Sequence, residues 1–139
     1  MIPDPRSDCP INRSLEMLGD QWSLLILRDI ALHNRRSFRD LLTGSGEGIS
    51  APVLSRRLAH LVASGFLTKT AVTRGQQGRY SLTELGLSTV PLLIELGHLG
   101  ARIDPTLSRN APNLGDTFQE QQARLEALRH AHLADSATN

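Results

Sequence analysis

The segment from Ile49 to Phe66 restricts the possible folds more than any other part of the chain, because it reads as one helix with two different faces. Its apolar residues recur at i, i+4, i+7 and i+8, which places them on a single stripe of a helix. They are Leu54, Leu58, Leu61 and Val62. Arg56 lies almost opposite that stripe. We therefore expect the leucines to face a core and Arg56 to face outward.

Both ends of this helix carry typical boundary residues. Ser50 is a good N-cap, and Pro52 fits the first turn because its missing N–H would have no helical partner there. Ser64 and Gly65 end the helix, with glycine in the left-handed position that follows. Small residues at the start and arginines one turn later suit a helix that enters a DNA major groove end-on. The alternative is an ordinary amphipathic helix with a solvated basic face, so the neighbouring segments must decide.

The residues before this helix indicate three more helices. The first begins near Asp8, which is a candidate N-cap, and has one apolar stripe. The second runs from Trp22 to about Leu32 and is apolar almost all round, so most of its sides should be buried. Ser37 is expected to cap a short third helix from Phe38 to about Leu42. The glycine-rich loop at 43–48 lacks the lysine and hydroxyl of a phosphate-binding loop, so no nucleotide site is expected there.

The residues after this helix predict a β-hairpin. Side chains over 66–72 alternate and are rich in β-branched types, which indicates a strand. A polar turn over 73–78 contains two glycines, and residues 79–82 return as the second strand. The tip of this hairpin is polar and basic.

A long fifth helix is predicted from Thr83 to about Arg102, with Ser81 and Glu84 spaced as a capping box. It has two apolar seams on opposite sides. One consists of Leu85, Leu92, Leu96 and Leu99, and the other of Leu87, Val90, Ile94 and Ala101. Because a domain of this size has one core, the second seam needs a second partner. The simplest partner is the same helix of another copy.

The C-terminal part reads as a loop followed by a last helix from Thr117 to about His132. Asp116 and Gln119 have the spacing of a capping box. The helix is weakly amphipathic, and we expect it to lie on the dimer surface, with a frayed end from Ala134. The chain is thus divided into a flexible arm (1–8), a DNA-binding domain with dimerisation helices (9–102) and a C-terminal loop and helix (103–139).

Charge and cysteine content limit the function classes. The formal net charge is only +1, so a surface for nucleic acid has to be local. The arginines do cluster, at 35–39, 56–57 and 74–79. The single cysteine, Cys9, excludes an internal disulfide and favours a reducing compartment. No apolar run reaches transmembrane length, so we expect a cytoplasmic protein without membrane contact.

No pattern in the sequence indicates an enzyme. The five histidines are scattered, and no nucleophile has a base nearby. His130 and His132 differ by two positions, so on a helix they point apart and cannot easily share a metal. We therefore expect no catalytic site, no metal and no cofactor.

The order of elements predicts a mainly α fold with a small β-hairpin wing: a winged helix-turn-helix that dimerises through its N- and C-terminal helices. Arg56 is the best candidate for guanine recognition, which uses a bidentate guanidinium contact. Arg57 is nearer the buried stripe and is expected to hold a phosphate or an internal carboxylate. The residues expected to contact DNA are Arg36, Ser50, Ala51, Pro52, Ser55, Arg56, Arg57, His60, Arg74, Gln76, Gln77 and Arg79.

Five linked motifs occur in a definite order. They are Cys9-Pro10, GDQWSLLILRD at 19–29, RSFRDL at 36–41, GIS with LSRRL and GFL over 48–67, and RYSLTELG at 79–86. Together they resemble the HxlR family of bacterial winged-helix transcription regulators, over about Cys9 to Ala101. The resemblance implies a homodimer on palindromic operator DNA, with dimer contacts from the first and fifth helices. It also implies a cysteine near the first helix that some members use to sense oxidants, quinones or aldehydes, and Cys9 matches that position.

Two alternatives stay open. Cys9 is a candidate sensor of electrophiles because a helix N-terminus can activate a thiol, but a small buried residue that packs the first helix against its mate would look the same. A winged helix can also serve as a protein-interaction or small-molecule-sensing regulator without thiol sensing. Exposed arginines favour DNA, since a protein partner would more often meet apolar residues. The expected partners are double-stranded DNA, a second copy, and a small-molecule or electrophile effector.

Overall fold

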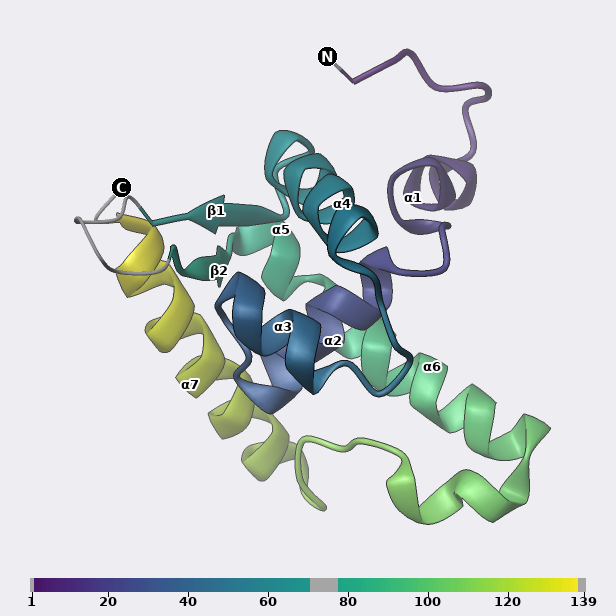
Figure 1. Ribbon diagram of the computed structural model, residues 1–139. Coiled ribbons are helices and arrows are strands. Elements are labelled where there is room, and N and C mark those ends of the chain that lie inside the picture. Colours follow the sequence, from purple (N-terminus) through teal and green to yellow (C-terminus); the bar gives the residue numbers. More distant parts are fainter. Residues whose placement is uncertain (1, 71–77, 138–139) are drawn as a thin grey trace.

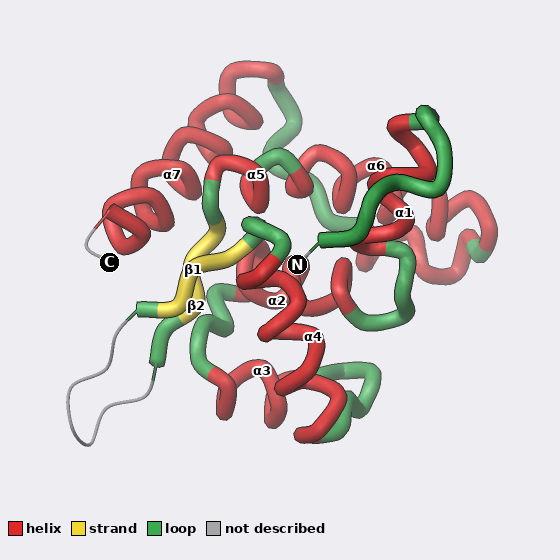
Figure 2. The backbone as a smooth tube through the Cα atoms, turned by 90° about the horizontal axis from the view of Figure 1, so that it is seen from above, coloured by secondary structure: helices red, strands yellow, loops and turns green. Residues whose placement is uncertain are grey.

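The computed structural model describes residues 2–70 and 78–137 (Figure 1). The elements, in chain order, are α1 (Pro10–Leu18), α2 (Ser23–His33), α3 (Phe38–Gly44), α4 (Ala51–Ala63), β1 (Leu67–Lys69), β2 (Tyr80–Leu82), α5 (Glu84–Leu87), α6 (Thr89–Ile103), the 3-10 helix η1 (Pro105–Asn110) and α7 (Phe118–Ala137). The prediction of a mainly helical fold with a small antiparallel hairpin is confirmed. This hairpin, β1 with β2, is the wing (Figure 2).

The core forms around α2, which lies in the middle of the molecule (Figure 1). Leu27 and Ile30 of α2 are completely buried, as its apolar sequence predicts. Leu54, Leu58 and Leu61 of α4 are also buried, so α4 turns its leucine stripe inward. The exposed face of α4 is fixed by this packing.

The boundaries of α3 and α4 follow the predicted capping residues. The hydroxyl of Ser37 accepts a hydrogen bond from the Asp40 N–H at 3.1 Å. The hydroxyl of Ser50 accepts one from the Val53 N–H at 3.4 Å. Gly65 follows α4 with a φ of 86°, the left-handed conformation that glycine adopts without steric cost. The chain therefore enters and leaves α4 where the sequence predicts.

An ion-pair cluster holds the loop before α4 against α2. Arg28 of α2 donates two hydrogen bonds to the Glu47 carboxylate, at 3.0 and 2.8 Å. It also donates one to Asp29, which is 4% exposed. The hydrogen bonds from Arg28 lower the pKa of Glu47, so this contact is present at neutral pH and is lost as the pH falls through that lowered pKa. The pair fixes the loop that leads into α4.

The predicted fifth helix is two helices. Thr83, not Ser81, caps α5 by accepting from the Gly86 N–H, and the chain turns at Ser88 before α6 begins. Ser81 cannot act as a cap because it lies inside β2 and is completely buried. The capping-box interpretation of Ser81 was therefore wrong.

The last helix begins one residue later than predicted and extends further. Glu120, rather than Gln119, closes its start, because its carboxylate accepts hydrogen bonds from the Asp116 and Thr117 N–H groups at 2.8 and 3.4 Å. His130 is exposed and His132 is 2% exposed, so the two histidines do point apart. In the parts of the chain that the structure describes, no helix is long and apolar enough to cross a membrane.

Candidate nucleic-acid interface

The outward face of α4 carries small and basic side chains. Ala51, Pro52, Ser55 and Arg56 are all exposed, and Pro52 and Arg56 lie on the side opposite the buried leucines. Ser50 is exposed at the N-cap, where its hydroxyl accepts from the Val53 N–H, and Pro52 in the same turn has no N–H. The positive end of the helix dipole at this start attracts anions such as phosphate. This face can meet a nucleic acid without any rearrangement of the core.

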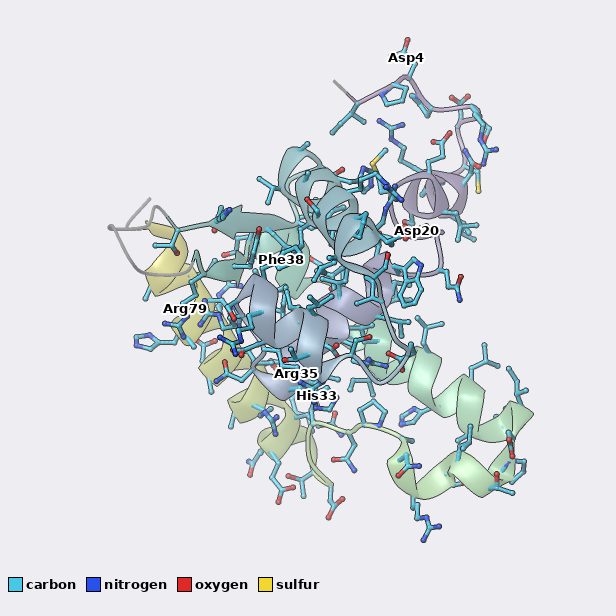
Figure 3. All side chains as sticks on the ribbon, viewed as in Figure 1. Asp4, Asp20, His33, Arg35, Phe38 and Arg79 are labelled. Atoms are coloured by element: carbon cyan, nitrogen blue, oxygen red, sulfur yellow. The ribbon has the colours of Figure 1, made fainter. Side chains whose placement is uncertain are left out.

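Arg57 is held by an internal carboxylate, one of the two roles that its position predicts. Its Nη1 lies 3.6 Å from Oδ1 of Asp20, in the turn between α1 and α2 (Figure 3). Burial raises the pKa of Asp20, but hydrogen bonds from the Ser23 hydroxyl and the N–H groups of Trp22 and Ser23, together with the Arg57 charge, bring the pKa below its ordinary value. Arg57 thus ties α4 to the start of α2.

His60 is also turned toward the protein. Its Nε2 lies 2.8 Å from the carbonyl oxygen of Met17 at the end of α1, and its side chain is half-buried. A ring nitrogen in this contact is not available to a base or a phosphate. His60 thus joins α4 to α1 through Nε2, and its predicted contact with DNA stays a prediction.

Arg36 is buried, which overturns its predicted contact with DNA. It is 5% exposed and lies between α2 and the wing. Its Nε donates to the carbonyl oxygen of Tyr80 at 2.9 Å, and its Nη2 donates to the hydroxyl of Ser81 at 2.5 Å. Its own carbonyl accepts from the Tyr80 N–H at 2.7 Å. Arg36 is therefore a structural residue that fixes β2.

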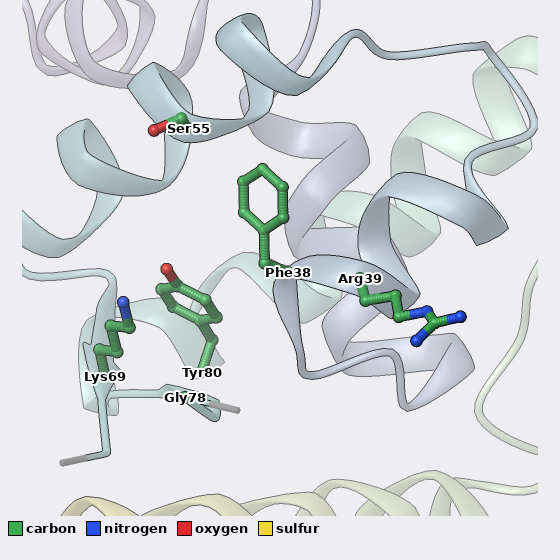
Figure 4. Close-up of a pocket in the computed structure, with 6 residues that line it drawn as sticks. All are labelled: Phe38, Arg39, Ser55, Lys69, Gly78 and Tyr80. Atoms are coloured by element: carbon green, nitrogen blue, oxygen red, sulfur yellow. The ribbon is translucent and has the colours of Figure 1, made fainter. Parts of the chain in front are cut away.

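A hollow of about 400 Å³ opens between α3, α4 and the wing (Figure 4). Phe38 and Tyr80 contribute its aromatic walls, while Ser55 of α4 and Lys69 of β1 lie at its rim. The Lys69 ammonium lies 5.6 Å from the centre of the Tyr80 ring, within the range of a cation–π contact. Arg39 of α3 borders the same hollow and is exposed. These polar groups are close to the exposed face of α4.

Lys69 and Arg39 are not among the DNA contacts that the sequence predicts. Lys69 is the single lysine of the sequence and stands in the predicted strand, two residues after the buried Leu67. Its placement follows from the register of the wing, in which Lys69 is opposite Tyr80. Arg39 falls between Phe38 and Leu41, off the buried side of α3. Both positions could be found by looking for cationic residues on the exposed sides of the elements next to α4.

The tip of the wing lies outside the described residues, and with it the predicted contacts Arg74, Gln76 and Gln77. Arg79 is exposed just beyond, and its carbonyl accepts from the Thr70 N–H at 2.8 Å, which continues the pairing of the two strands. Figure 3 shows Arg79 beside the wing, near α7. Its predicted role with DNA stays a prediction.

Cys9 occupies the N-cap of α1, in place of Asp8, and makes no side-chain cap. Its thiol is exposed. The preceding arm lies against α1, because Arg6 donates to the Glu16 carboxylate at 3.1 Å and Arg13 donates to the Pro3 carbonyl at 2.9 Å. Reagents can therefore reach Cys9, but its reactivity stays a prediction.

One side of α6 is apolar and exposed. The predicted outer seam is open in the single chain, because Leu92, Leu96 and Leu99 are 42%, 40% and 54% exposed. The opposite seam is inside, with Leu87 and Val90 buried. On α1, Ile11 and Leu15 are 72% and 59% exposed. We name the exposed leucines at 92, 96 and 99 the α6 seam.

Comparison with protein families gives a match to the HxlR-like helix-turn-helix over residues 17–108. That range contains α2, α3, α4, the wing and α6, and it ends before α7. The matched segment covers more than half of the 139 residues.

Two curated relatives carry the same type of description. The chain is 31% identical over 94 residues to an uncharacterized HTH-type transcriptional regulator of Synechocystis, covering 67% of this chain and 68% of that protein. It is 34% identical over 91 residues to another from Mycobacterium bovis, covering 65% of this chain and 56% of that protein. The matched segment thus spans about half to two thirds of these relatives.

Solved structures show the same fold. One is PA1607, a transcription-factor candidate, with a TM-score of 0.63 and 31% identity, covering 70% of this chain and 66% of that one. Another is a candidate regulator of the MarR family from Porphyromonas gingivalis, with a TM-score of 0.60 and 29% identity. The match covers 72% of this chain and 95% of that one. The reduced form of the regulator YodB from B. subtilis is 21% identical, with a TM-score of 0.57, and the match covers 70% of this chain and 96% of that one. At this identity the likeness shows only a shared fold.

Proposed function

The chain belongs to the HxlR-like helix-turn-helix family of transcriptional regulators, and on that premise we propose that it binds a palindromic DNA operator as a homodimer, with α4 in the major groove. One observation carries this proposal: α4 buries Leu54, Leu58 and Leu61, exposes Arg56 on its opposite face and exposes Ser55 on its flank. An arginine that projects from such a helix can donate two hydrogen bonds to O6 and N7 of guanine. Arg56 is thus the residue assigned to base recognition.

The groups beside α4 would hold the DNA backbone. The hollow between α4 and the wing offers the Lys69 ammonium and the Ser55 hydroxyl, and Arg39 of α3 lines it with its guanidinium turned outward (Figure 4). Such groups suit phosphate oxygens, which fix the register of a protein on a duplex without reading its sequence. The start of α4 at Ser50 adds the positive end of the helix dipole. We therefore assign Lys69 and Arg39 to phosphate contacts.

The α6 seam supports the homodimer. A contiguous apolar strip on a helix of this length costs free energy in water and is stabilised when a copy of itself covers it. A twofold pair presents two α4 helices, which requires two half-sites in opposite orientation, one helical turn or a multiple apart. The palindromic operator follows from that symmetry.

The signal that the regulator senses is a separate matter. Cys9 stays a candidate for electrophile sensing, and a small-molecule effector stays the alternative. A protein-interaction platform is less well supported, since the exposed face of α4 carries Arg56 and small side chains rather than large apolar ones.

The proposal is tested by selecting bound duplexes from a random pool and then replacing Arg56 by alanine. We expect the selected DNA to contain an inverted repeat with guanine at a fixed position of each half-site. Arg56→Ala should lower affinity for that DNA by about 5- to 150-fold for each half-site and relax the preference for guanine, because a bidentate contact discriminates by about 1–3 kcal/mol. Fluorescence anisotropy at fixed salt measures both.

The matched control for Arg56→Ala is Arg124→Ala, which removes an exposed arginine from α7. It should leave affinity and preference unchanged. Selection that recovers no common sequence, or an Arg56→Ala protein that discriminates bases as well as the wild type, would contradict the assignment.

Lys69→Ala should flatten the salt dependence of binding without altering the preferred sequence. Each phosphate contact that is lost reduces the slope of log K against log salt by about 0.9, and a dimer loses one contact in each protomer. Titrations at several salt concentrations measure the slope. Lys69→Arg, which keeps the charge, should restore it, and an unchanged slope in Lys69→Ala would exclude Lys69 as a phosphate contact.

A further inference from the structure

Helix α7 lies along the wing strand β2 (Figure 1). The backbone N–H of Leu82 in β2 donates to Nδ1 of His132 in α7 at 3.0 Å. Leu82 is completely buried and His132 is 2% exposed, so this hydrogen bond is shielded from water. Near the surface, Arg129 of α7 also forms a two-bond ion pair with Glu84, at the start of α5. The last helix is thus attached to the wing and to the element that follows it.

The chemistry of this contact is specific. A ring nitrogen that accepts a backbone N–H must carry a lone pair, so Nδ1 of His132 is unprotonated here. The amide oxygen of asparagine occupies nearly the same place relative to the backbone as Nδ1 of histidine. The oxygen of glutamine lies one carbon further out. His132→Asn therefore keeps an acceptor near the Leu82 N–H, whereas His132→Gln keeps a polar side chain but moves its acceptor away. Comparing the two variants shows whether the position of the acceptor matters.

The contact completes the fixation of β2. One edge of β2 pairs with β1, in the register Leu67 opposite Leu82 and Lys69 opposite Tyr80. On the other edge, the Tyr80 N–H donates to the Arg36 carbonyl at 2.7 Å, and two residues further on the Leu82 N–H donates to His132. Successive outward N–H groups of this strand are thus bound by two different parts of the chain. Because β1 pairs with β2, fixing β2 also fixes β1, which carries Lys69.

We propose that α7 is a brace for the wing, and that His132 is a positioning residue through which the docking of α7 sets the DNA affinity. The brace lies outside the segment that matches the family, which ends at residue 108. In this protein the helix after that segment would therefore do more than lie on a dimer surface. The link to DNA affinity rests on the DNA-binding function proposed above, whereas the brace itself does not.

The brace is tested first without DNA, by amide hydrogen exchange of the full-length protein. His132→Leu should speed exchange at the Leu82 amide about tenfold or more, because a buried N–H loses its acceptor and the strand opens more often. His132→Asn should keep the rate within about threefold of wild type, while His132→Gln should resemble the leucine variant. If His132→Leu does not fold, the Asn and Gln variants decide. Equal exchange in all variants would overturn the brace.

The effect on function is tested by DNA affinity at a temperature where every variant is folded. We expect His132→Leu and His132→Gln to weaken binding about five- to tenfold and His132→Asn to retain it. The loss should overlap with that of Lys69→Ala in a double mutant, since both act through the wing, and add independently to that of Arg56→Ala. Faster exchange with unchanged DNA affinity would overturn the positioning role. A wild-type protein that binds no duplex would overturn the proposed function instead, and the exchange comparison would still decide the brace.

Discussion

Replacing both Leu96 and Leu99 by glutamate is expected to turn the protein into a monomer and to lower operator affinity by roughly 10²- to 10⁴-fold. The two side chains belong to the α6 seam and are 40% and 54% exposed in the single chain. In a twofold interface each glutamate would meet the same region of its mate, so four carboxylates would have to be desolvated near one another. Analytical ultracentrifugation measures the association state, and anisotropy measures the affinity.

The size of this effect comes from linkage between the two half-sites. Once one protomer is bound, the second α4 meets its half-site at a high effective concentration, and a monomer loses that advantage without losing any single contact. Phe118→Glu is the control, because it makes the same chemical change at a 73% exposed position at the start of α7. A Leu96→Glu/Leu99→Glu protein that still sediments as a dimer would show that the α6 seam is not the interface.

The seam was predictable because its signal is local. Apolar positions on two opposite sides of one helix are visible in the sequence, and a small domain cannot bury both. The leucine stripe of α4 was predictable for the same reason. Val62 marks the limit of that method, since it is 37% exposed although the spacing assigns it to the stripe. A residue eight positions after Leu54 is rotated by about 80° from it on a helix, which places it at the edge of the buried side.

The contacts that the sequence did not indicate join distant parts of the chain. The partners of Arg36 are 44 and 45 positions away, the Met17 partner of His60 is 43 away, and the Leu82 partner of His132 is 50 away. Periodicity and capping patterns compare residues only within a few turns, so they cannot show that an arginine is buried. The wrong cap assignment of Ser81 has the same origin: Ser81 has a capping hydroxyl, but its pairing with Thr68 of β1 places it in a strand.

Arg36→Met should therefore lower the free energy of unfolding by about 2–4 kcal/mol, because it removes a buried charged donor and leaves the Tyr80 carbonyl and the Ser81 hydroxyl without it. Methionine keeps most of the apolar stem, so the loss comes mainly from hydrogen bonding. Denaturant unfolding measures it. Arg39→Met on neighbouring α3 is the control and, being exposed, should change stability by no more than about 0.5 kcal/mol.

The same pair of variants separates the two roles that an arginine could have here. If Arg36 supports β2, Arg36→Met lowers the stability of the protein, while its folded fraction keeps the wild-type slope of log K for DNA against log salt. If Arg39 contacts phosphate, Arg39→Met lowers that slope by about 0.9 per protomer and leaves the stability unchanged. The reverse pattern would place the Arg36 guanidinium on DNA, as the sequence alone suggested. Burial favours the first outcome, because Arg36 is 5% exposed as a residue and its guanidinium cannot reach a phosphate unless it separates from β2.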